Sequence, residues 1–147
     1  MDKKHEYYMQ LAIDLAKKGK EDPNGGAFGA VIVKEDKILV AVHNGVKKEG
    51  DITQHAELYA IQLASKKIGK ENLNQCTLYT SCEPCLMCLG ACYWANFKAI
   101  YFGASAADAK EYGYVYSDVY YQMDVKKRHQ EFNMIQLMAE EAIKVWQ

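Results

Sequence analysis

The sequence predicts an α/β protein: a three-layer α/β/α sandwich in which a mixed, about five-stranded central sheet carries helices on both faces. Two observations lead to this fold class. Near the start of the chain, two apolar runs flank a short polar turn, which is typical of a β-hairpin. After the hairpin, short apolar segments alternate with stretches that repeat at helical spacing.

The first half of the chain is expected to supply a helix, the hairpin and a second helix. Apolar side chains recur at helical spacing over residues 3–18, and the Pro-Asn-Gly-Gly turn at 23–26 follows that helix. The hairpin strands are predicted at 27–33 and 37–42. The second helix carries Leu58, Ile61, Ala64 and Ile68, and Thr53 is expected to cap its start.

The second half is expected to continue the alternation. Strands are predicted at 77–80, at 99–102 and near 132–137. Helices are predicted from Pro84 through Trp94, at 104–112 and at 139–145. Residues 114–126 show no pattern that assigns them to either class.

Length and charge limit the possible functions. The 147 residues contain no linker or repeat, so a single domain over 1–147 is expected. A formal net charge of −1 argues against a nucleic-acid partner, because such binding uses clustered positive charge. The longest apolar runs, such as 30–33 and 38–42, are too short to cross a bilayer, so no membrane association is expected. The polar N-terminal segment lacks the features of an export signal, so a cytoplasmic location is expected.

Four of the five cysteines lie between Cys82 and Cys92. Without an export signal, metal binding or thiol chemistry is favoured over a disulfide framework. Cys85 and Cys88 are three residues apart at a predicted helix start, where the helix dipole favours thiolates. Taken alone, this pair is compatible with a metal site, with a redox site or with two buried core cysteines.

His55 and Glu57 shift the balance towards metal. With Cys85 and Cys88, the imidazole of His55 completes a three-ligand Zn²⁺ site, and three protein ligands leave the open position that catalytic zinc requires. A structural site would need a fourth ligand, for which Cys82 is the candidate. Because residues two apart on a helix point in different directions, His55 and Glu57 can share a site only beyond the helix N-terminus. We therefore expect two helix starts to converge on one metal ion.

This arrangement predicts hydrolytic chemistry. Zinc lowers the pKa of a bound water molecule towards neutrality, which supplies hydroxide. A carboxylate that is not a ligand can move the proton of that water to a leaving group, and Glu57 suits this role. The simpler alternative makes Glu57 a first-turn acid on a solvated helix face.

His55-x-Glu57 followed by Pro84-Cys85-x-x-Cys88 resembles the signature of the zinc-dependent cytidine/deoxycytidylate deaminase superfamily. Residues 26–33, 77–95 and 106–113 are most similar to its bacterial guanine deaminase branch. The resemblance implies a cytidine deaminase-like fold and one Zn²⁺ per chain, held by His55, Cys85 and Cys88. It also implies deamination of a purine base by a zinc-bound hydroxide with Glu57 as proton shuttle, most simply guanine to xanthine plus ammonia.

The resemblance also assigns substrate contacts. It implies that Asn44 hydrogen-bonds the base edge and that Phe28 and Trp94 pack on the ring; from the residues alone, these are a turn residue and two core residues. Tyr116 stands where the guanine branch has an Asp that contacts the base, and Gln54 replaces a small residue. Guanosine, cytosine, cytidine or another amino-heterocycle therefore stay open as substrates.

Two other functions stay open. A tRNA adenosine deaminase shares the metal motifs, although the basic run at 126–128 lies near acidic residues. The other alternative is a non-catalytic zinc or redox protein. The resemblance also implies a homodimer, in one form with an exchanged C-terminal segment, and the tyrosine-rich segment 112–121 is a candidate to cover a neighbour's pocket.

Overall fold

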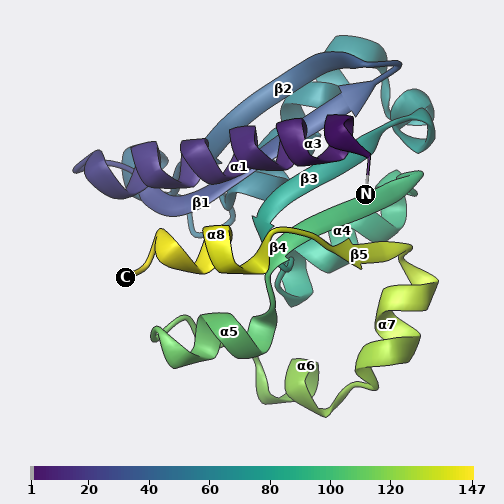
Figure 1. Cartoon of the computed structure of the whole chain (residues 1–147). Coiled ribbons are helices and arrows are strands. Elements are labelled where there is room, and N and C mark those ends of the chain that lie inside the picture. The colour runs from purple at the N-terminus through teal and green to yellow at the C-terminus, as the bar shows by residue number, and fades with distance from the viewer. Residues whose placement is uncertain (1) are drawn as a thin grey trace.

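A mixed sheet runs through the middle of the protein, with the strand order β2-β1-β3-β4-β5 (Figure 1). The computed structural model describes residues 2–147. The strands are β1 (Gly26–Lys34), β2 (Lys37–Asn44), β3 (Thr77–Cys82), β4 (Ala99–Ala104) and β5 (Met134–Gln136). β1 is antiparallel to both β2 and β3, whereas β3, β4 and β5 are parallel. The expected sheet is confirmed in strand number and in its mixed character.

Helices cover both faces of this sheet, as predicted. The helices are α1 (Lys3–Glu21), α2 (Val46–Glu49), α3 (Ala56–Ile68), η1 (Lys70–Gln75, a 3₁₀ helix), α4 (Leu86–Ala95), α5 (Ala106–Glu111), α6 (Asp118–Gln122), α7 (Val125–Glu131) and α8 (Ala139–Lys144). In Figure 1, α1 and α8 lie in front of the sheet, and α3 and α4 lie behind it.

Strand alternation explains the two cores. Successive residues of a strand point to opposite faces, so neighbours along one strand enter different cores. Val31 and Tyr79 join the core under α1, while Ile32 and Leu78 join the core under α3 and α4. The nearly continuous apolar character of the central strands follows from burial on both faces.

The directions of the strands bring four segments to one end of the sheet, here called this edge of the sheet. These segments are the start of β1, the ends of β2 and β3, and the start of α4. β1 is antiparallel to β3, with Ala30 opposite Thr80, so β1 begins where β3 ends. The last residue of β2, Asn44, is opposite Gly26 at that same edge. The end of β3 leads directly into the segment that starts α4. Side chains at the starts of β1 and α4 and at the end of β2 therefore gather at one place.

Several predicted boundaries were wrong. Thr53 does not cap the second helix: α3 begins at Ala56 with His55 as N-cap, and the Thr53 hydroxyl donates to Asp51. Helix α4 starts at Leu86, after Pro84, because Cys85 is still extended. Segments α2 and η1 were not predicted, and the unassigned stretch contains α6 and the start of α7. Among residues 2–147, no helix has both the length and the apolar character needed to cross a bilayer.

Helix α1 packs very closely on β1 at Gly29. A Cβ atom there would lie 2.1 Å from the carbonyl oxygen of Ala12 and 2.8 Å from Cβ of Leu15. We expect Gly29→Ala to lower the free energy of unfolding by about 1–3 kcal/mol, because backbone must move to relieve the overlap. Urea denaturation measures this change.

Gly45→Ala is the matched control. Gly45 has a negative φ, and its added Cβ would lie no closer than 3.8 Å to any neighbouring atom, which is ordinary contact. It should change stability by about 1 kcal/mol or less, because no backbone has to move. Equal stability of the two variants would contradict the close packing of α1 on β1.

Candidate active site

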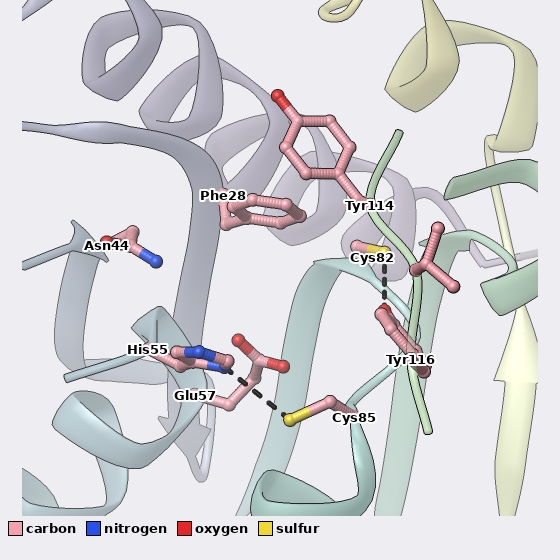
Figure 2. A pocket seen from close by; sticks show the side chains of 9 residues that line it. Phe28, Asn44, His55, Glu57, Cys82, Cys85, Tyr114 and Tyr116 are labelled. Atoms are coloured by element: carbon pink, nitrogen blue, oxygen red, sulfur yellow. Dashed lines mark hydrogen bonds between the residues drawn. The ribbon is translucent and has the colours of Figure 1, made fainter. Parts of the chain in front are cut away.

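Two helix starts meet at this edge of the sheet. His55 is the N-cap residue of α3 and Cys85 is the N-cap residue of α4; both have extended backbone, and neither side chain caps its own helix. The two side chains instead meet, with Cys85 Sγ 3.5 Å from His55 Nδ1 (Figure 2). The predicted convergence of these helix starts is confirmed.

Cys88 completes a compact group of donor atoms. It lies three residues into α4 and is fully buried, and its sulfur shares a face with that of Cys85. The potential ligand atoms of His55, Cys85 and Cys88 all lie within 4.8 Å of one another. Two sulfurs and one imidazole nitrogen are a donor set that suits zinc, so the residues present fit Zn²⁺.

Cys82 lies outside this group, although it lines the same cavity. Its sulfur is 3.0 Å from the hydroxyl oxygen of Tyr116. Burial raises the pKa of the Cys82 thiol well above its usual value. Within residues 2–147, the three-donor group therefore has no fourth cysteine, and the structural-site alternative loses its candidate ligand.

The local charges favour the metal-binding form of Cys85. The neighbouring Cys88 thiol lowers the pKa of Cys85 to about 4, and His55 acts in the same direction. The contact with Cys85 in turn raises the pKa of His55. Cys85 is therefore a thiolate at neutral pH, which is the form that coordinates metal ions.

Glu57 is a buried acid in the first turn of α3. Only 6% of its surface is exposed, so the alternative that places it on a solvated helix face is wrong. Burial raises the pKa of Glu57 to about 7, and the negative Cys85 adds to the effect. A carboxyl group with this pKa can both accept and donate a proton near neutral pH.

A cavity of about 270 Å³ opens above these groups (Figure 2). Its lining residues are Phe28, Asn44, His55, Glu57, Cys82, Cys85, Tyr114, Val115 and Tyr116. The cavity is large enough for a planar heterocycle and lies directly against the donor group and Glu57. Among its lining residues, Glu57 is the one carboxylic acid.

Asn44 presents a defined hydrogen-bond donor to the cavity. Its Oδ1 accepts from the backbone N–H of Val46 at 3.0 Å, which fixes the orientation of the amide. Its Nδ2 therefore points towards the cavity (Figure 2). Gly26 makes room for this side chain, since a Cβ on Gly26 would lie 2.9 Å from Cγ of Asn44.

An aromatic wall closes another side. The rings of Phe28 and Tyr114 meet edge to face, with centroids 4.9 Å apart. Trp146 supports both rings from behind, at 5.8 Å from Phe28 and 5.1 Å from Tyr114, and its indole N–H donates to the carbonyl of Ala27. The C-terminal segment thus packs on its own chain here.

Sequence analysis missed Tyr114 and Val115 as lining residues. The tyrosine-rich segment 112–121 is a candidate to cover a neighbour's pocket; in this structure Tyr114 and Tyr116 line the cavity of their own chain. Sequence pattern does not place these two side chains in the cavity, because Tyr114 packs on Phe28 and Trp146, and Tyr116 contacts Cys82 and Glu83, all more than 30 residues away along the chain.

Trp94 does not line this cavity, contrary to expectation. Its side chain is 83% exposed, and it borders a separate cavity with Tyr93 and Phe132. The reason is distance along the helix: Trp94 is nine residues beyond Cys85, or roughly 13 Å at 1.5 Å per residue. A ring at the far end of α4 is out of reach of a substrate held at the helix start.

The fold and the three-donor group are those of a family of zinc-binding deaminases. The family model described as the cytidine and deoxycytidylate deaminase zinc-binding region matches residues 2–104. The chain belongs to this family. The match confirms the predicted membership of the cytidine/deoxycytidylate deaminase superfamily, and it confirms that the protein is an enzyme.

The chain is similar to members of several classes within the family. It is 47% identical to the guanine deaminase of Bacillus subtilis over 120 residues, which cover 82% of this chain and 77% of that protein. A "Probable cytosine deaminase" of Schizosaccharomyces pombe is 40% identical over 99 residues, covering 67% and 59%. The tRNA-specific adenosine deaminase of Aquifex aeolicus is 37% identical over 110 residues, covering 75% and 71%.

A solved structure supports the same relationship. The X-ray structure of guanine deaminase from Bacillus subtilis superimposes with a TM-score of 0.76 at 40% sequence identity. The superposition covers 90% of this chain and 92% of that one. The predicted fold class is therefore confirmed both by the layers and by a close structural relative.

Cys88→Ser should remove the bound metal. Serine retains the shape of cysteine but lacks the thiolate, and the loss of one of three ligands weakens zinc binding by several orders of magnitude. We expect metal analysis of purified protein to find about one zinc per wild-type chain and almost none in the variant.

Cys76→Ser is the matched control. Cys76 is equally buried but lies before β3, and its thiol faces the carbonyl oxygen of Asn72. This variant should retain its zinc. Equal zinc content in both serine variants would show that Cys88 is not a ligand.

Proposed function

We propose that this chain deaminates a nucleobase hydrolytically in the 270 Å³ cavity, with guanine to xanthine plus ammonia as the favoured reaction. The observation that carries the proposal is the placement of buried Glu57 beside the His55, Cys85 and Cys88 donor group, on one cavity. The 47% identity to a guanine deaminase supports the choice of base.

In this proposal His55, Cys85 and Cys88 hold Zn²⁺. The bound ion supplies an open coordination position at which the pKa of water falls towards neutrality. Cys85 enters the site as a thiolate, so no proton has to leave it when metal binds. Cys88 would hold the ion as a thiolate, and its full burial keeps bulk water away from that sulfur.

Glu57 moves the protons. Its carboxylate takes one proton from the attacking water and passes it to the ring nitrogen beside the attacked carbon, and it then carries the remaining hydroxyl proton to the amino nitrogen. A C–O bond forms, the C–N bond to the amino group breaks, and ammonia departs as the carbonyl forms. A pKa of about 7 serves both steps, because the acid and the base form are each accessible near neutral pH. Its burial next to the donor group keeps the transferred proton from bulk water.

Asn44 and Phe28 are the proposed substrate contacts. The Asn44 amide donates to an acceptor on the ring edge, and the Phe28 ring packs on the base plane. Tyr116 forms one wall of the cavity, and its hydroxyl donates to the carbonyl of Glu83. The wall therefore offers a neutral surface to the base. This feature makes the order of preference among bases the critical measurement.

The proposal is tested by ammonia release from guanine, guanosine, cytosine, cytidine and adenine, with purified zinc-loaded protein. Guanine should turn over fastest and yield xanthine. Glu57→Gln is the matched control: it should retain zinc but lose turnover by at least about 10²–10⁴-fold, because the general acid–base group is removed. Turnover of no purine would overturn the choice of base, and undiminished turnover in Glu57→Gln would overturn the mechanism.

We also propose that the chain forms a homodimer through α4. Exposed residues lie along one side of this helix: Leu86, Met87, Gly90, Tyr93 and Trp94. Their spacing forms a continuous apolar strip, and Gly90 at its centre allows close approach of a second helix. Trp94 does not line the active-site cavity, and in this proposal it contacts the second subunit.

Trp94→Asp should convert a dimer to a monomer in light scattering at micromolar concentration. A buried unpaired charge at the centre of an apolar interface opposes association. Ile52→Asp is the control, because Ile52 is equally exposed at 83% but lies on the loop before α3. A monomeric wild-type protein, or equal behaviour of both variants, would contradict the proposed interface.

The remaining assignments complete the proposal. Residues 1–147 act as one deaminase domain that serves purine metabolism. A cytoplasmic location is supported by the five free cysteines, since reducing conditions keep the ligand thiols available for metal.

A further inference from the structure

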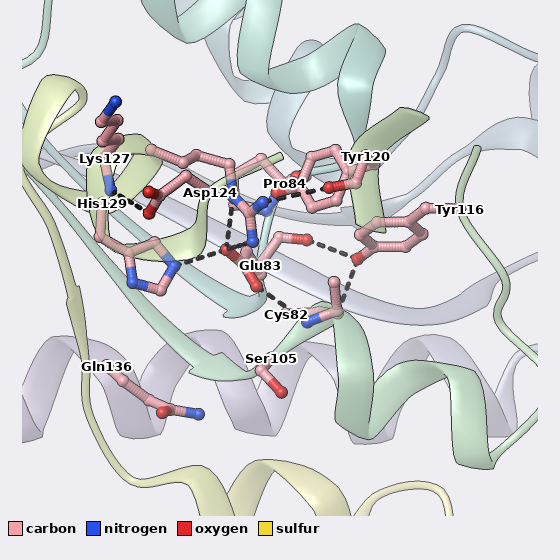
Figure 3. Close-up of polar contacts among 12 residues, drawn as sticks. Cys82, Glu83, Pro84, Ser105, Tyr116, Tyr120, Asp124, Lys127, His129 and Gln136 are labelled. Atoms are coloured by element: carbon pink, nitrogen blue, oxygen red, sulfur yellow. Dashed lines mark hydrogen bonds and ion pairs between the residues drawn. The ribbon is translucent and has the colours of Figure 1, made fainter. Parts of the chain in front are cut away.

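Two residues, Glu83 and Pro84, connect the end of β3 to Cys85 at the start of α4. Their backbone carbonyls are held by two tyrosines from a distant segment. Tyr116 donates its hydroxyl to the carbonyl of Glu83, and Tyr120 donates its hydroxyl to the carbonyl of Pro84 at 2.6 Å (Figure 3). Burial raises the pKa of both phenols, so they stay protonated and act as donors.

The side chain of Glu83 is held by the same distant segment. Only 1% of Glu83 is exposed. Its Oε2 accepts from Arg128 Nη2 at 3.0 Å, from Arg128 Nε at 3.2 Å and from His129 Nε2 at 2.7 Å. Its Oε1 accepts from the backbone N–H of Ala106 at 2.9 Å. Both oxygens of this carboxylate are therefore hydrogen-bonded, Oε2 by three donor atoms and Oε1 by one.

Arg128 also holds the tyrosine that holds Pro84. Its Nη1 donates to the carbonyl of Tyr120 at 3.2 Å, and its guanidinium lies 4.2 Å from the centre of the Tyr120 ring. Arg128 is 6% exposed and Tyr120 is fully buried. Buried ion pairs contribute little net stability, because desolvation offsets their attraction. This network is better explained by the positions of the residues that it holds, Glu83 and Pro84.

We propose that Tyr116, Tyr120, Arg128 and His129 form a clamp on Glu83 and Pro84, and that this clamp positions Cys85 for metal binding. Four side chains from one segment converge on the two residues that directly precede Cys85. The inference rests on the proposed function, because it takes Cys85 as a metal ligand. Partners outside the ligand set commonly change metal affinity by about 10–100-fold.

The clamp also connects the metal ligand to the cavity wall. The Tyr116 ring lines the cavity, while its hydroxyl holds Glu83. Since the Tyr116 hydroxyl proton is directed at that carbonyl, the contact with Cys82 has the Cys82 thiol as donor. The Tyr116 side chain therefore both lines the substrate cavity and holds the segment before Cys85. Because all four clamp residues act through Glu83 and Pro84, they are positioning residues.

Tyr120→Phe tests the clamp, because it removes one hydroxyl and keeps the ring. We expect zinc affinity, measured by competition with a chromophoric chelator, to fall about tenfold or more. The thiolate-to-metal absorption bands of the Co²⁺-loaded protein should also shift. The metal-free protein should lose only the stability of one buried hydrogen bond.

Tyr79→Phe is the matched control. Tyr79 is 2% exposed, and its hydroxyl lies 2.6 Å from His5 Nδ1 on the α1 side of the sheet. It should lose comparable stability while keeping zinc affinity and the cobalt spectrum unchanged. If Tyr120→Phe behaves like Tyr79→Phe in both metal measurements, the clamp has no positioning role and the inference is overturned.

Two further results decide the remaining cases. If Tyr120→Phe does not fold, Tyr116→Phe is measured in the same way: weaker zinc binding supports the clamp, and unchanged binding overturns it. A wild-type protein that binds metal but deaminates no base defeats the proposed function, while the affinity comparison still decides the clamp. A wild-type protein that binds no metal defeats both.

Discussion

The contact between Cys85 and His55 joins the starts of two helices, and the geometry of the cavity depends on it. Each residue occupies an N-cap position, where a side chain ordinarily satisfies the helix's own N–H groups. Neither side chain makes a capping hydrogen bond to its own helix, and the two side chains contact each other instead. The positive ends of α3 and α4 then face the Cys85 thiolate, which compensates in part for the missing caps. Each helix start therefore lacks a stabilising side-chain cap, and in return His55 and Cys85 join Cys88 in one group of potential metal ligands.

The burial of Glu57 follows from the same arrangement. A residue two positions after the His55 N-cap must enter the first turn of α3, and here that turn is packed between sheet and α4. Burial destabilises the ionised form of this carboxyl group by more than the neighbouring His55 stabilises it, and the raised pKa of Glu57 records this cost. Functional sites often contain groups placed at such a cost, since the shifted pKa suits proton transfer near neutral pH.

The sequence predicted those parts that depend on local pattern. The hairpin, the central strands and the helices α1, α3 and α4 follow from periodicity, and the spacing from His55 to Cys88 indicated converging helix starts. Segment 114–131 could not be predicted, because its conformation depends on contacts across more than thirty residues, such as Tyr120 with Pro84 and Arg128 with Glu83. Trp94 was misplaced for a similar reason: sequence similarity assigns a ring to a pocket without stating how far along its helix that ring lies.

The chain contains two tryptophans, and they occupy very different surroundings. The Trp94 indole is open to solvent on α4, whereas the Trp146 indole stands behind the Phe28 and Tyr114 rings and bonds to the carbonyl of Ala27. In a single chain their fluorescence emission should differ in wavelength, with the exposed Trp94 indole emitting further to the red; burial of Trp94 in the proposed dimer should move its emission towards the blue. The two indoles are therefore intrinsic fluorescent reporters. Trp94 reports changes in solvent exposure on α4, and Trp146 reports movement of the Phe28 and Tyr114 rings.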